Sequence, residues 1–484
     1  MIIADETPAS PAKGSPSQLA HTPPAPPPYQ ASQNPQRPNN EVGASSYPSR
    51  THIVYASTPL VPGRPIALTA RRRFLNAFLV AILIWFLFSV FVRSVIELAF
   101  WNHRHGRMDW PGDYSLPDET RVRNCLDDAD WQEYSRDAPH NSFPYHSRAS
   151  FELPVDSDAL MFLARGSQQA GEFDVRASSE VSDKAKIDVV VSFHTFDARS
   201  RAHICQIRRE RGLGLGIFTP PQPRYPSGPR ENQLFFFVTV YLPSTADGSP
   251  LHIRDLSTDL PLYSHRVGHL EDHVLFKNIS FHTSNMPIGI ESLFAANASM
   301  HTSNSPISGS FNTSSSLTLS TSNSPIRVDV GLSNEDKKAT SLNMKTSNSG
   351  IHASVSLLKE SGSENSGGSY DVTGVTSNSE VVFDFPASPI DSVLHLKGKT
   401  SNGNAIATLN PAYEGAFYLK TTLFRPEVQR TGATDPSGRE RRRSVEYSTY
   451  QRGLVQGRVK WAGSHAAGGS VELQTSNLPV TLKI

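Results

Sequence analysis

A six-residue motif repeated through the C-terminal half of the chain places the strongest constraint on its fold. The string Thr-Ser-Asn-Ser-Pro-Ile occurs twice without change and five more times in altered form. The copies begin at Thr283, Thr302, Thr321, Thr346, Thr376, Thr400 and Thr475, at intervals of 19, 19, 25, 30, 24 and 75 residues. Intervals near 20 residues are typical of solenoids, in which each coil buries its apolar face only by stacking on its neighbours.

Apolar residues alternate with polar ones on both sides of each motif, as in the stretches 326–330 and 480–484. A period of two predicts strands with one buried face. The Ser-Asn pair between two such strands favours a turn, because Asn tolerates the left-handed backbone region and can bond its own backbone. Each unit is therefore expected to consist of a strand, a tight corner and a second strand.

These units predict an all-β fold, a β-solenoid resembling a parallel β-helix. Stacked coils would align one asparagine from each corner in a ladder of side-chain amides about 4.8 Å apart. The ladder would contain Asn285, Asn304, Asn323, Asn348, Asn378, Asn402 and Asn477. An antiparallel β-sandwich stays open as the alternative, because the long interval at 404–470 interrupts the repeat.

The first 100 residues contain a polar tail and an apolar segment. Residues 1–70 are rich in Pro, Ser, Ala, Asn and Gln, so a disordered cytosolic tail is expected. Residues 71–100 predict a transmembrane helix with a basic flank, because the nineteen residues from Phe74 to Val92 carry no charge. As a helix they would span roughly 28 Å, close to the ~30 Å core of a bilayer. The arginines 71–73 at the N-terminal end favour a cytosolic N-terminus.

The predicted topology is that of a single-pass type II membrane protein held in the lipid bilayer by a signal anchor. Residues 101–150 are polar and irregular and are expected to form a stalk or lead-in. Residues 151–484 are expected to form a β-rich extracytoplasmic domain, with the repeats at 276–425 and a closing unit at 451–484. This domain would lie in the lumen of the secretory pathway or outside the plasma membrane.

Five residues of the C-terminal part are candidates for modification in a secretory lumen. Asn278, Asn297 and Asn312 each begin an N-glycosylation sequon without proline. The only two cysteines, Cys125 and Cys205, are expected to be able to form one disulfide in an oxidising compartment.

A run of arginines predicts a processing site. Arg442 and Arg443 lie in the sequence Gly-Arg-Glu-Arg-Arg-Arg-Ser, which resembles a dibasic cleavage site of a subtilisin-like proprotein protease. The alternative is a solvated charged loop, which needs no protease at all.

The tail contains a motif for a cytosolic partner. Pro26, Pro27, Pro28 and Tyr29 match the PPxY ligand of WW domains, which dock preformed polyproline II segments. Lys13 is the lysine of the tail, so it would be the ubiquitin acceptor if a WW-domain ubiquitin ligase binds at Tyr29. The consequence would be endocytic sorting.

Other function classes find little support in the sequence. A net charge of +1 gives no basis for nucleic-acid binding. No nucleophile elbow, phosphate loop or dinucleotide fingerprint is present, so neither a cofactor nor a catalytic residue is assigned. His265, His269 and His273 have the spacing of one helix face, but their flanks resemble strands, so surface histidines are expected there rather than a metal site.

A membrane-tethered carbohydrate-active enzyme on a β-helix is the enzymatic alternative. Outward carboxylates such as Asp329 and Asp384 would lie two coils apart, roughly 9.6 Å at about 4.8 Å per coil. That separation just exceeds the range of about 6.5–9.5 Å for inverting hydrolysis. A cleft with two close carboxylates would favour an enzyme, whereas a continuous Ser, Thr and Asn face would not.

The repeated motif with its alternating apolar flanks resembles the adhesin-type β-solenoid domain of bacterial surface proteins. The layout of the whole chain resembles a fungal family of single-pass membrane proteins with a C-terminal β-rich domain of unknown function. Besides the repeats, the stretches 409–422, 455–463 and 471–484 carry this resemblance. It implies a β-rich extracytoplasmic domain and brings no catalytic motif.

The expected function is therefore that of a non-enzymatic membrane glycoprotein. Its β-solenoid would be displayed as an adhesin-like binding or structural surface for an extracellular carbohydrate or protein. The second alternative, besides the enzyme, is a sorting protein that acts through the PPxY motif of its tail.

Overall fold

The computed structural model of the chain describes residues 114–127, 130–134, 142–220, 230–334, 338–359, 367–463 and 468–484. All of these belong to one compact unit, Phe91–Ile484, whereas the other unit, Met1–Val90, lies outside the described residues. The predicted tail and transmembrane segment therefore lie outside them too. None of the helices in the described ranges is long and apolar enough to cross a membrane.

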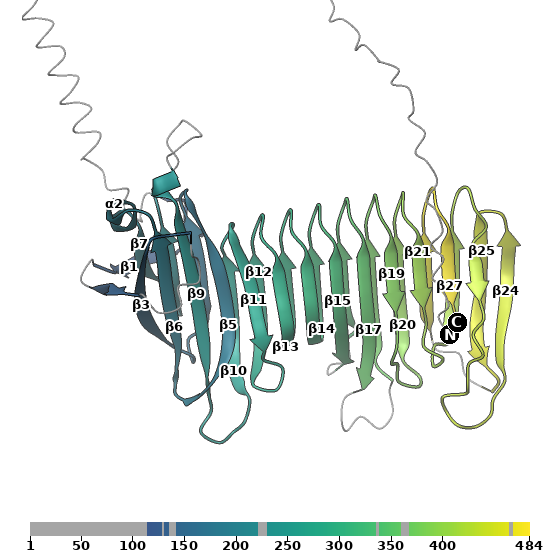
Figure 1. Ribbon diagram of the computed structural model, residues 1–484. Helices are drawn as coiled ribbons and strands as arrows, with labels where there is room; N and C mark the ends of the chain where they lie inside the picture. Colours follow the sequence, from purple (N-terminus) through teal and green to yellow (C-terminus); the bar gives the residue numbers. More distant parts are fainter. Residues whose placement is uncertain are drawn as a thin grey trace, which may run out of the picture. The chain divides into compact units, whose positions relative to one another are not determined.

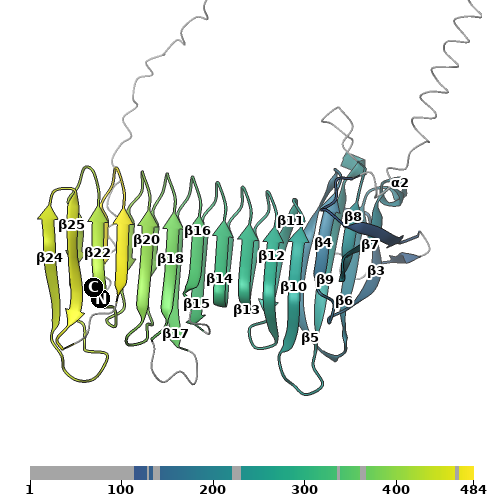
Figure 2. The same ribbon diagram turned by 180° about the vertical axis from the view of Figure 1, so that it is seen from behind.

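The unit is a stack of coils made of two facing layers of strands (Figures 1 and 2). We call the layer whose strands lead into the repeated corners the entry sheet. In spatial order it contains β1 (Arg121–Cys125), β7 (His203–Arg209), β8 (Gly212–Phe218), β4 (Leu160–Arg165), β10 (Leu251–Asp259), β12 (Val274–His282), the second halves of β13 (Ile288–His301) and β14 (Ile307–Ser320), β16 (Thr340–Lys345), β18 (Ser369–Val375), β20 (Val393–Lys399), β26 (Gly469–Gln474), β22 (Gly415–Lys420), β25 (Leu454–Trp461) and β24 (Arg443–Gln451).

The layer whose strands leave the corners is the exit sheet. In spatial order it contains β2 (Gln132–Glu133), β3 (Tyr145–Pro154), β6 (Lys184–Phe193), β9 (Leu234–Ser244), β5 (Gln169–Val181), β11 (Tyr263–His269), the first halves of β13 and β14, β15 (Ile326–Asn334), β17 (Ile351–Lys359), β19 (Val381–Asp384), β21 (Ala405–Thr408), β27 (Val480–Lys483) and β23 (Glu427–Gln429). Two short helices, α2 (Phe196–Ser200) and η3 (Arg230–Asn232), lie near the N-terminal end of the stack (Figure 1).

The predicted β-solenoid is confirmed, because the strands around all seven motifs pair in parallel with those of the next coil. The antiparallel sandwich is therefore wrong for the repeats. Antiparallel pairing occurs at the two ends of the stack, where β3, β6 and β9 pair at one end and β22, β25 and β24 at the other.

The core lies between the layers and follows from the alternation seen in the sequence. The first apolar residue after each corner faces inward, and its register partners in the neighbouring coils are the same position of the next motif. This row is fully buried and consists of Ile288, Ile307, Ile326, Ile351, Val381, Ala405 and Val480. Each coil buries one residue of this row against the same residue of the coils beside it. A single coil is therefore stable only when neighbouring coils cover this residue.

The corners form the predicted asparagine ladder. Each Nδ2 donates to the Oδ1 of the preceding corner, at distances of 2.5–2.9 Å over six successive bonds. The corner threonines point inward and donate to backbone carbonyls of the preceding corner, as Thr302 does to Met286 and Thr475 does to Gly403. The repeated motif thus encodes a corner whose polar groups are bonded to the coils before and after it.

The last two strands of the chain are inserted out of sequence order. β26 pairs with β20 on one side and with β22 on the other, and β27 lies in the same way between β21 and β23. The long interval at 404–470 therefore does not break the stack. Its residues form the terminal coil β22–β23 and the hairpin β24–β25, beyond the coil that contains Asn477.

The folded unit begins before residue 151, the boundary that the sequence predicts. β1, β2 and the first part of β3 lie within 101–150, the predicted stalk or lead-in. β3 forms a ten-residue antiparallel ladder with β6, and Ala149 is buried in the core. These strands were not predicted because they lie at the end of the stack and contain no copy of the repeated motif.

Candidate functional site

The outward side of the entry sheet carries rows of mainly uncharged polar side chains over β12, β13, β14 and β16, and the exposed Lys345 of β16 lies beside Ser320. Parallel register places similar residues side by side, as with Ser280, Ser299 and Thr318. Because successive side chains of a strand point to opposite faces, these rows alternate with the buried core. We call this surface the polar face; it comprises Asn278, Ser280, His282, Asn297, Ser299, His301, Ser316, Thr318, Ser320, Ser341, Asn343 and Lys345.

Side chains of the polar face bond to one another along the stack. Asn297 Nδ2 donates to Asn278 Oδ1 at 3.2 Å, and the Ser316 hydroxyl donates to Asn297 Oδ1 at 2.8 Å. The rings of His282 and His301 stack with 4.8 Å between centroids and 6° between planes. Burial lowers the pKa of His301, and His282 lowers it further. The face is thus an ordered array of hydroxyl, amide and imidazole groups, which suits hydrogen bonding to a polar ligand.

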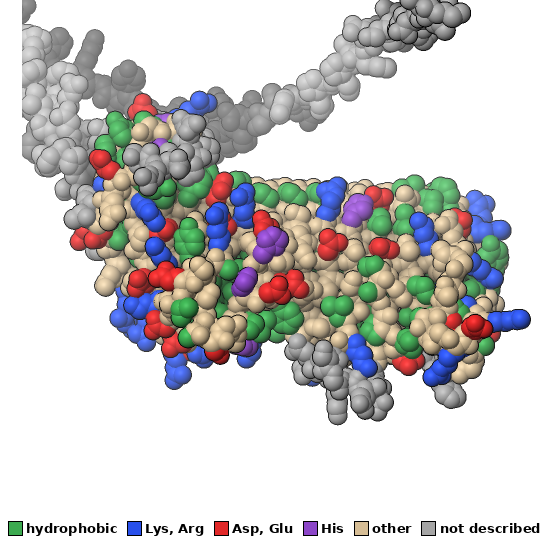
Figure 3. Space-filling view, turned by 60° about the horizontal axis from the view of Figure 1, so that its bottom comes forward, with side chains coloured by type: hydrophobic (Ala, Val, Ile, Leu, Met, Phe, Trp, Pro, Cys, Tyr) green, Lys and Arg blue, Asp and Glu red, His purple; other side chains and the backbone are tan. Residues whose placement is uncertain are grey.

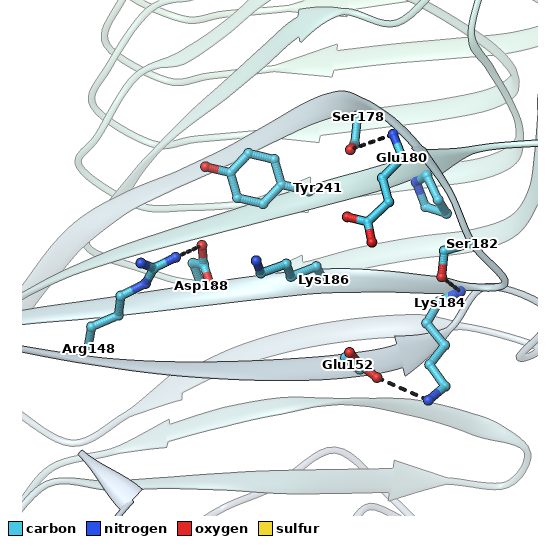
Figure 4. A pocket seen from close by; sticks show the side chains of 10 residues that line it. Arg148, Glu152, Ser178, Glu180, Ser182, Lys184, Lys186, Asp188 and Tyr241 are labelled. Atoms are coloured by element: carbon cyan, nitrogen blue, oxygen red, sulfur yellow. Dashed lines mark hydrogen bonds and ion pairs between the residues drawn. The ribbon is translucent and has the colours of Figure 1, made fainter. Parts of the chain in front are cut away.

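A second candidate is a cleft of about 340 Å³ on the exit sheet near the N-terminal end, between β3, β5, β6 and β9 (Figure 4). Arg148 pairs with Asp188, and Lys184 Nζ lies 3.0 Å from Glu152 Oε2. Figure 4 shows Lys186 between these two ion pairs. This cleft was not predicted from the sequence, because its residues come from four separate strands and form no motif.

The cleft combines opposite charges with one aromatic ring. Tyr241 of β9 is the register partner of Lys186, and Glu180 lines the cleft from the end of β5 (Figure 4). Glu152 and Asp188 each have a basic partner, so neither is the isolated carboxyl group that serves as a general acid. The cleft thus presents charged groups of both signs and one phenol ring to a polar ligand.

The carboxylates that the enzymatic alternative requires lie on the outward side of the exit sheet. Register places Asp329 beside Ser354 and Ser354 beside Asp384, so the two carboxylates are two coils apart as expected. The surface around them is open and includes Arg327 and His352. Figure 3 shows charged side chains scattered over a largely uncharged polar surface. This geometry does not enclose a sugar ring between two carboxyl groups.

The three histidines at helical spacing do not meet. His265 is buried in β11, and its Nε2 lies 2.7 Å from the Thr258 hydroxyl, so the expectation that it is a surface histidine was wrong. It is buried because the alternation of β11 places it on the inward face. His269 is exposed and lies 3.2 Å from Glu291, and His273 is also exposed. Among the described residues, no group of three or more His, Cys, Asp or Glu could hold a metal ion.

The three sequon asparagines lie within strands, and all are partly buried. Asn278 and Asn297 are register partners on the polar face. Asn312 lies on β14 and donates through Nδ2 to Glu271. A glycan on Nδ2 leaves one N–H for such a bond, so glycosylation at these positions stays a prediction.

The two cysteines form a disulfide that joins β1 to β7. Cys125 and Cys205 are register partners in the antiparallel pair, so the bond fastens the edge strand of the entry sheet to its neighbour. Sequence spacing alone does not show this proximity, because 80 residues separate the two positions.

The arginine run is held by the fold at two positions. Arg441 pairs with Asp435 at 2.9 Å, and Arg443 begins β24 with its guanidinium over the Trp461 ring. Arg442 between them is exposed. Processing after Arg442 or Arg443 stays a prediction, and a protease would have to open this end of β24. The PPxY motif and Lys13 lie outside the described residues.

Comparisons with known proteins show weak likeness in structure. No protein-family model matches the chain, and no curated protein matches it in sequence. A candidate cell adhesion protein from Clostridium sporogenes is 7% identical and has a TM-score of 0.14, over 69% of this chain and 99% of the other. A candidate adhesin from Parabacteroides merdae is 12% identical with a TM-score of 0.19, over 52% of this chain and 96% of the other. At such scores neither structure assigns a function to the polar face.

Proposed function

We propose that the protein is a non-enzymatic, adhesin-like display protein whose β-solenoid binds a carbohydrate through the polar face. The observation that carries this proposal is the ordered array of side chains on β12, β13, β14 and β16, in which Ser, Thr and Asn outnumber His282, His301 and Lys345. Hydroxyl and amide groups both donate and accept, as recognition of a polyhydroxylated ligand requires. The rigid, bonded coils hold these groups in place before binding, which reduces the entropic cost of association.

The proposal includes a type II membrane topology with the solenoid outside the cytosol. Three features support it: the uncharged segment from Phe74 to Val92, the flanking arginines, and the disulfide between Cys125 and Cys205. Disulfides persist in oxidising compartments and are rare in the cytosol. The sequons at Asn278, Asn297 and Asn312 would then face glycosyltransferases of the secretory lumen.

A larger, charged side chain at the centre of the polar face should weaken carbohydrate binding. Ser299→Glu would obstruct the approach of a ligand, and its carboxylate would have to lose part of its hydration on binding. We expect the affinity of the purified protein for immobilised β-glucan, mannan or chitin to fall by roughly tenfold or more. The measurement is a pull-down titration of the full chain in detergent.

Ser308→Glu is the matched control, because Ser308 is also exposed but lies on the exit sheet. It should bind like the unmodified chain. If both variants bind as tightly as the unmodified chain, the polar face is not the binding site. If both variants lose affinity to the same extent, the loss is a general effect of added negative charge.

Protease added to intact membrane vesicles should test the topology. We expect removal of the tail from the cytosolic side, while a fragment containing residues 151–484 is protected and becomes smaller after glycosidase treatment. If protease digests that fragment from the cytosolic side and the fragment carries no glycan, the orientation is opposite to the proposed one. The glycosylation and processing predictions would then both be wrong.

A further inference from the structure

The two layers of the stack do not end together at the C-terminal end. The exit sheet stops at β23, which has three residues and, among the described strands, pairs only with β27. The entry sheet continues for two more strands, β25 and then β24 (Figure 2). β24 pairs only with β25 in the described part of the chain, so its nine residues present an open edge. An open edge is a template for pairing with another strand.

Aromatic rings and arginines cover the part of the entry sheet that extends past the exit sheet. Tyr447 and Tyr450 of β24 are 38% and 58% exposed. Arg430 lies over the Tyr447 ring at 5.8 Å from its centroid, and Arg425 lies over the Tyr450 ring at 5.5 Å. A guanidinium stacked on an aromatic face keeps its N–H edge available, and its orientation is fixed in advance for a carboxylate.

This end of the molecule is strongly basic although the whole chain is nearly neutral. Residues 425–458 contain eight arginines and four acidic residues, a net charge of +4 against +1 for the chain. Two of the acidic residues are already paired, Asp435 with Arg441 and Glu446 with Lys460. Figure 3 shows Lys and Arg side chains gathered at the end of the stack that carries β24 in Figure 1. The exposed Arg425, Arg430 and Arg442 are therefore left for an external anion.

We propose that β24 is a docking edge for an extended acidic peptide segment of a partner protein. The segment would add to β24 as a further strand through backbone hydrogen bonds. Its carboxylates would bond to Arg425, Arg430 and Arg442, and its alternate side chains would point to the opposite face. This site lies at the end of the stack, so it leaves the polar face free for its own ligand.

Peptide binding to the full chain in detergent tests the docking edge. The probe is a fluorescent eight-residue peptide of alternating Thr and Glu, and the control peptide has Gln in place of each Glu. We expect saturable binding of the Glu peptide by fluorescence anisotropy, weakened roughly tenfold or more by the change to Gln, because charge-assisted hydrogen bonds are about twice as strong as neutral ones. The variant Arg425→Gln/Arg430→Gln/Arg442→Gln should show the same loss.

Two controls separate strand addition from simple charge attraction. The second probe is the Glu peptide N-methylated at alternate residues, which keeps its charge. Alternate N–H groups of a strand point to opposite edges, so one methylation pattern blocks the edge that meets β24 and the other leaves that edge free. We expect one of the two alternating methylation patterns to bind and the other to fail. The variant Arg208→Gln/Arg266→Gln/Arg327→Gln, which removes three arginines elsewhere on the stack, should bind normally.

Three results would overturn the proposal. The first is equal binding of both methylated peptides, which would leave only non-specific attraction. The second is normal binding by the β24 variant. The third is binding of phosphatidylserine vesicles that depends on the same three arginines while the peptide does not bind, which would make this end a lipid contact. None of these results depends on carbohydrate binding at the polar face.

Discussion

Replacing Phe311 with alanine should lower the free energy of unfolding by about 3–5 kcal/mol. Phe311 is fully buried in β14, with Leu293 and Val330 as register partners on the two neighbouring coils. Its removal leaves a cavity shared by three coils, and each coil is stabilised mainly by its neighbours. Urea unfolding of the purified chain, followed by far-UV circular dichroism, measures the change.

Phe424→Ala makes the same chemical change at a residue that is 41% exposed. We expect it to cost only about 1 kcal/mol, since 41% of Phe424 stays in contact with water and its removal leaves no enclosed cavity. A separate, earlier transition in the Phe311→Ala curve would still agree with the structure, because stacked coils can unfold in parts. Similar shifts for both variants would contradict the burial of Phe311.

Acid should destabilise the solenoid through His265. Burial lowers the pKa of this histidine from 6.5 to about 3, and Thr258 and the backbone carbonyl of Tyr263 bond to its ring. The unfolded chain therefore binds a proton that the folded chain does not, between about pH 6.5 and pH 3. Stability from this residue is fully present above pH 6.5 and is lost as pH falls, by at most about 1.4 kcal/mol per pH unit.

The variant His265→Gln isolates this contribution. At neutral pH it should be less stable than the unmodified chain, because glutamine fills the site less well between Phe173 and Phe281. At pH 4.5 the unmodified chain should have lost about 2–3 kcal/mol that the variant keeps, so the difference between the two should shrink or reverse. A constant difference between pH 7 and pH 4.5 would show that His265 is protonated in the folded state.

The repeated motif was sufficient to predict the coil, the corner and the ladder, but the corner asparagines do not adopt the left-handed region that was expected of them, and their amides bond to neighbouring corners. Asn323 bonds to Asn304 before it and accepts from Asn348 after it, as stacking of identical corners requires. The ends of the stack were not predictable in this way. Cys125 and Cys205, or Arg443 and Trp461, meet only through pairings between segments far apart in the chain.

The candidate sites divide along the same line. Ser280, Ser299 and Thr318 were recognisable as outward residues from their position relative to each motif, so the polar face could be predicted from sequence. Lys186 and Tyr241 could not, since the cleft that contains them depends on the register of β6 with β9. His265 was predicted to lie at the surface, and this was wrong because the alternation along β11 places it on the inward face with Tyr263 and Val267.

The placement of β26 and β27 has a consequence for synthesis of the protein. During synthesis, which starts at the N-terminus, coils can be added one by one as far as β20 and β21, but the next coil in space is made of β26 and β27, which are translated after β22–β25. β20 therefore stays unpaired on this side until a strand much later in the sequence has been made. The corners that then meet, Asn402 and Asn477, are 75 residues apart in the sequence. Such a non-local closure is slow, since the loop must be ordered before its contacts form. Truncation between β22 and β26 would leave β20 and β22 without the strand that joins them, so this part of the stack closes only after β26 has been made.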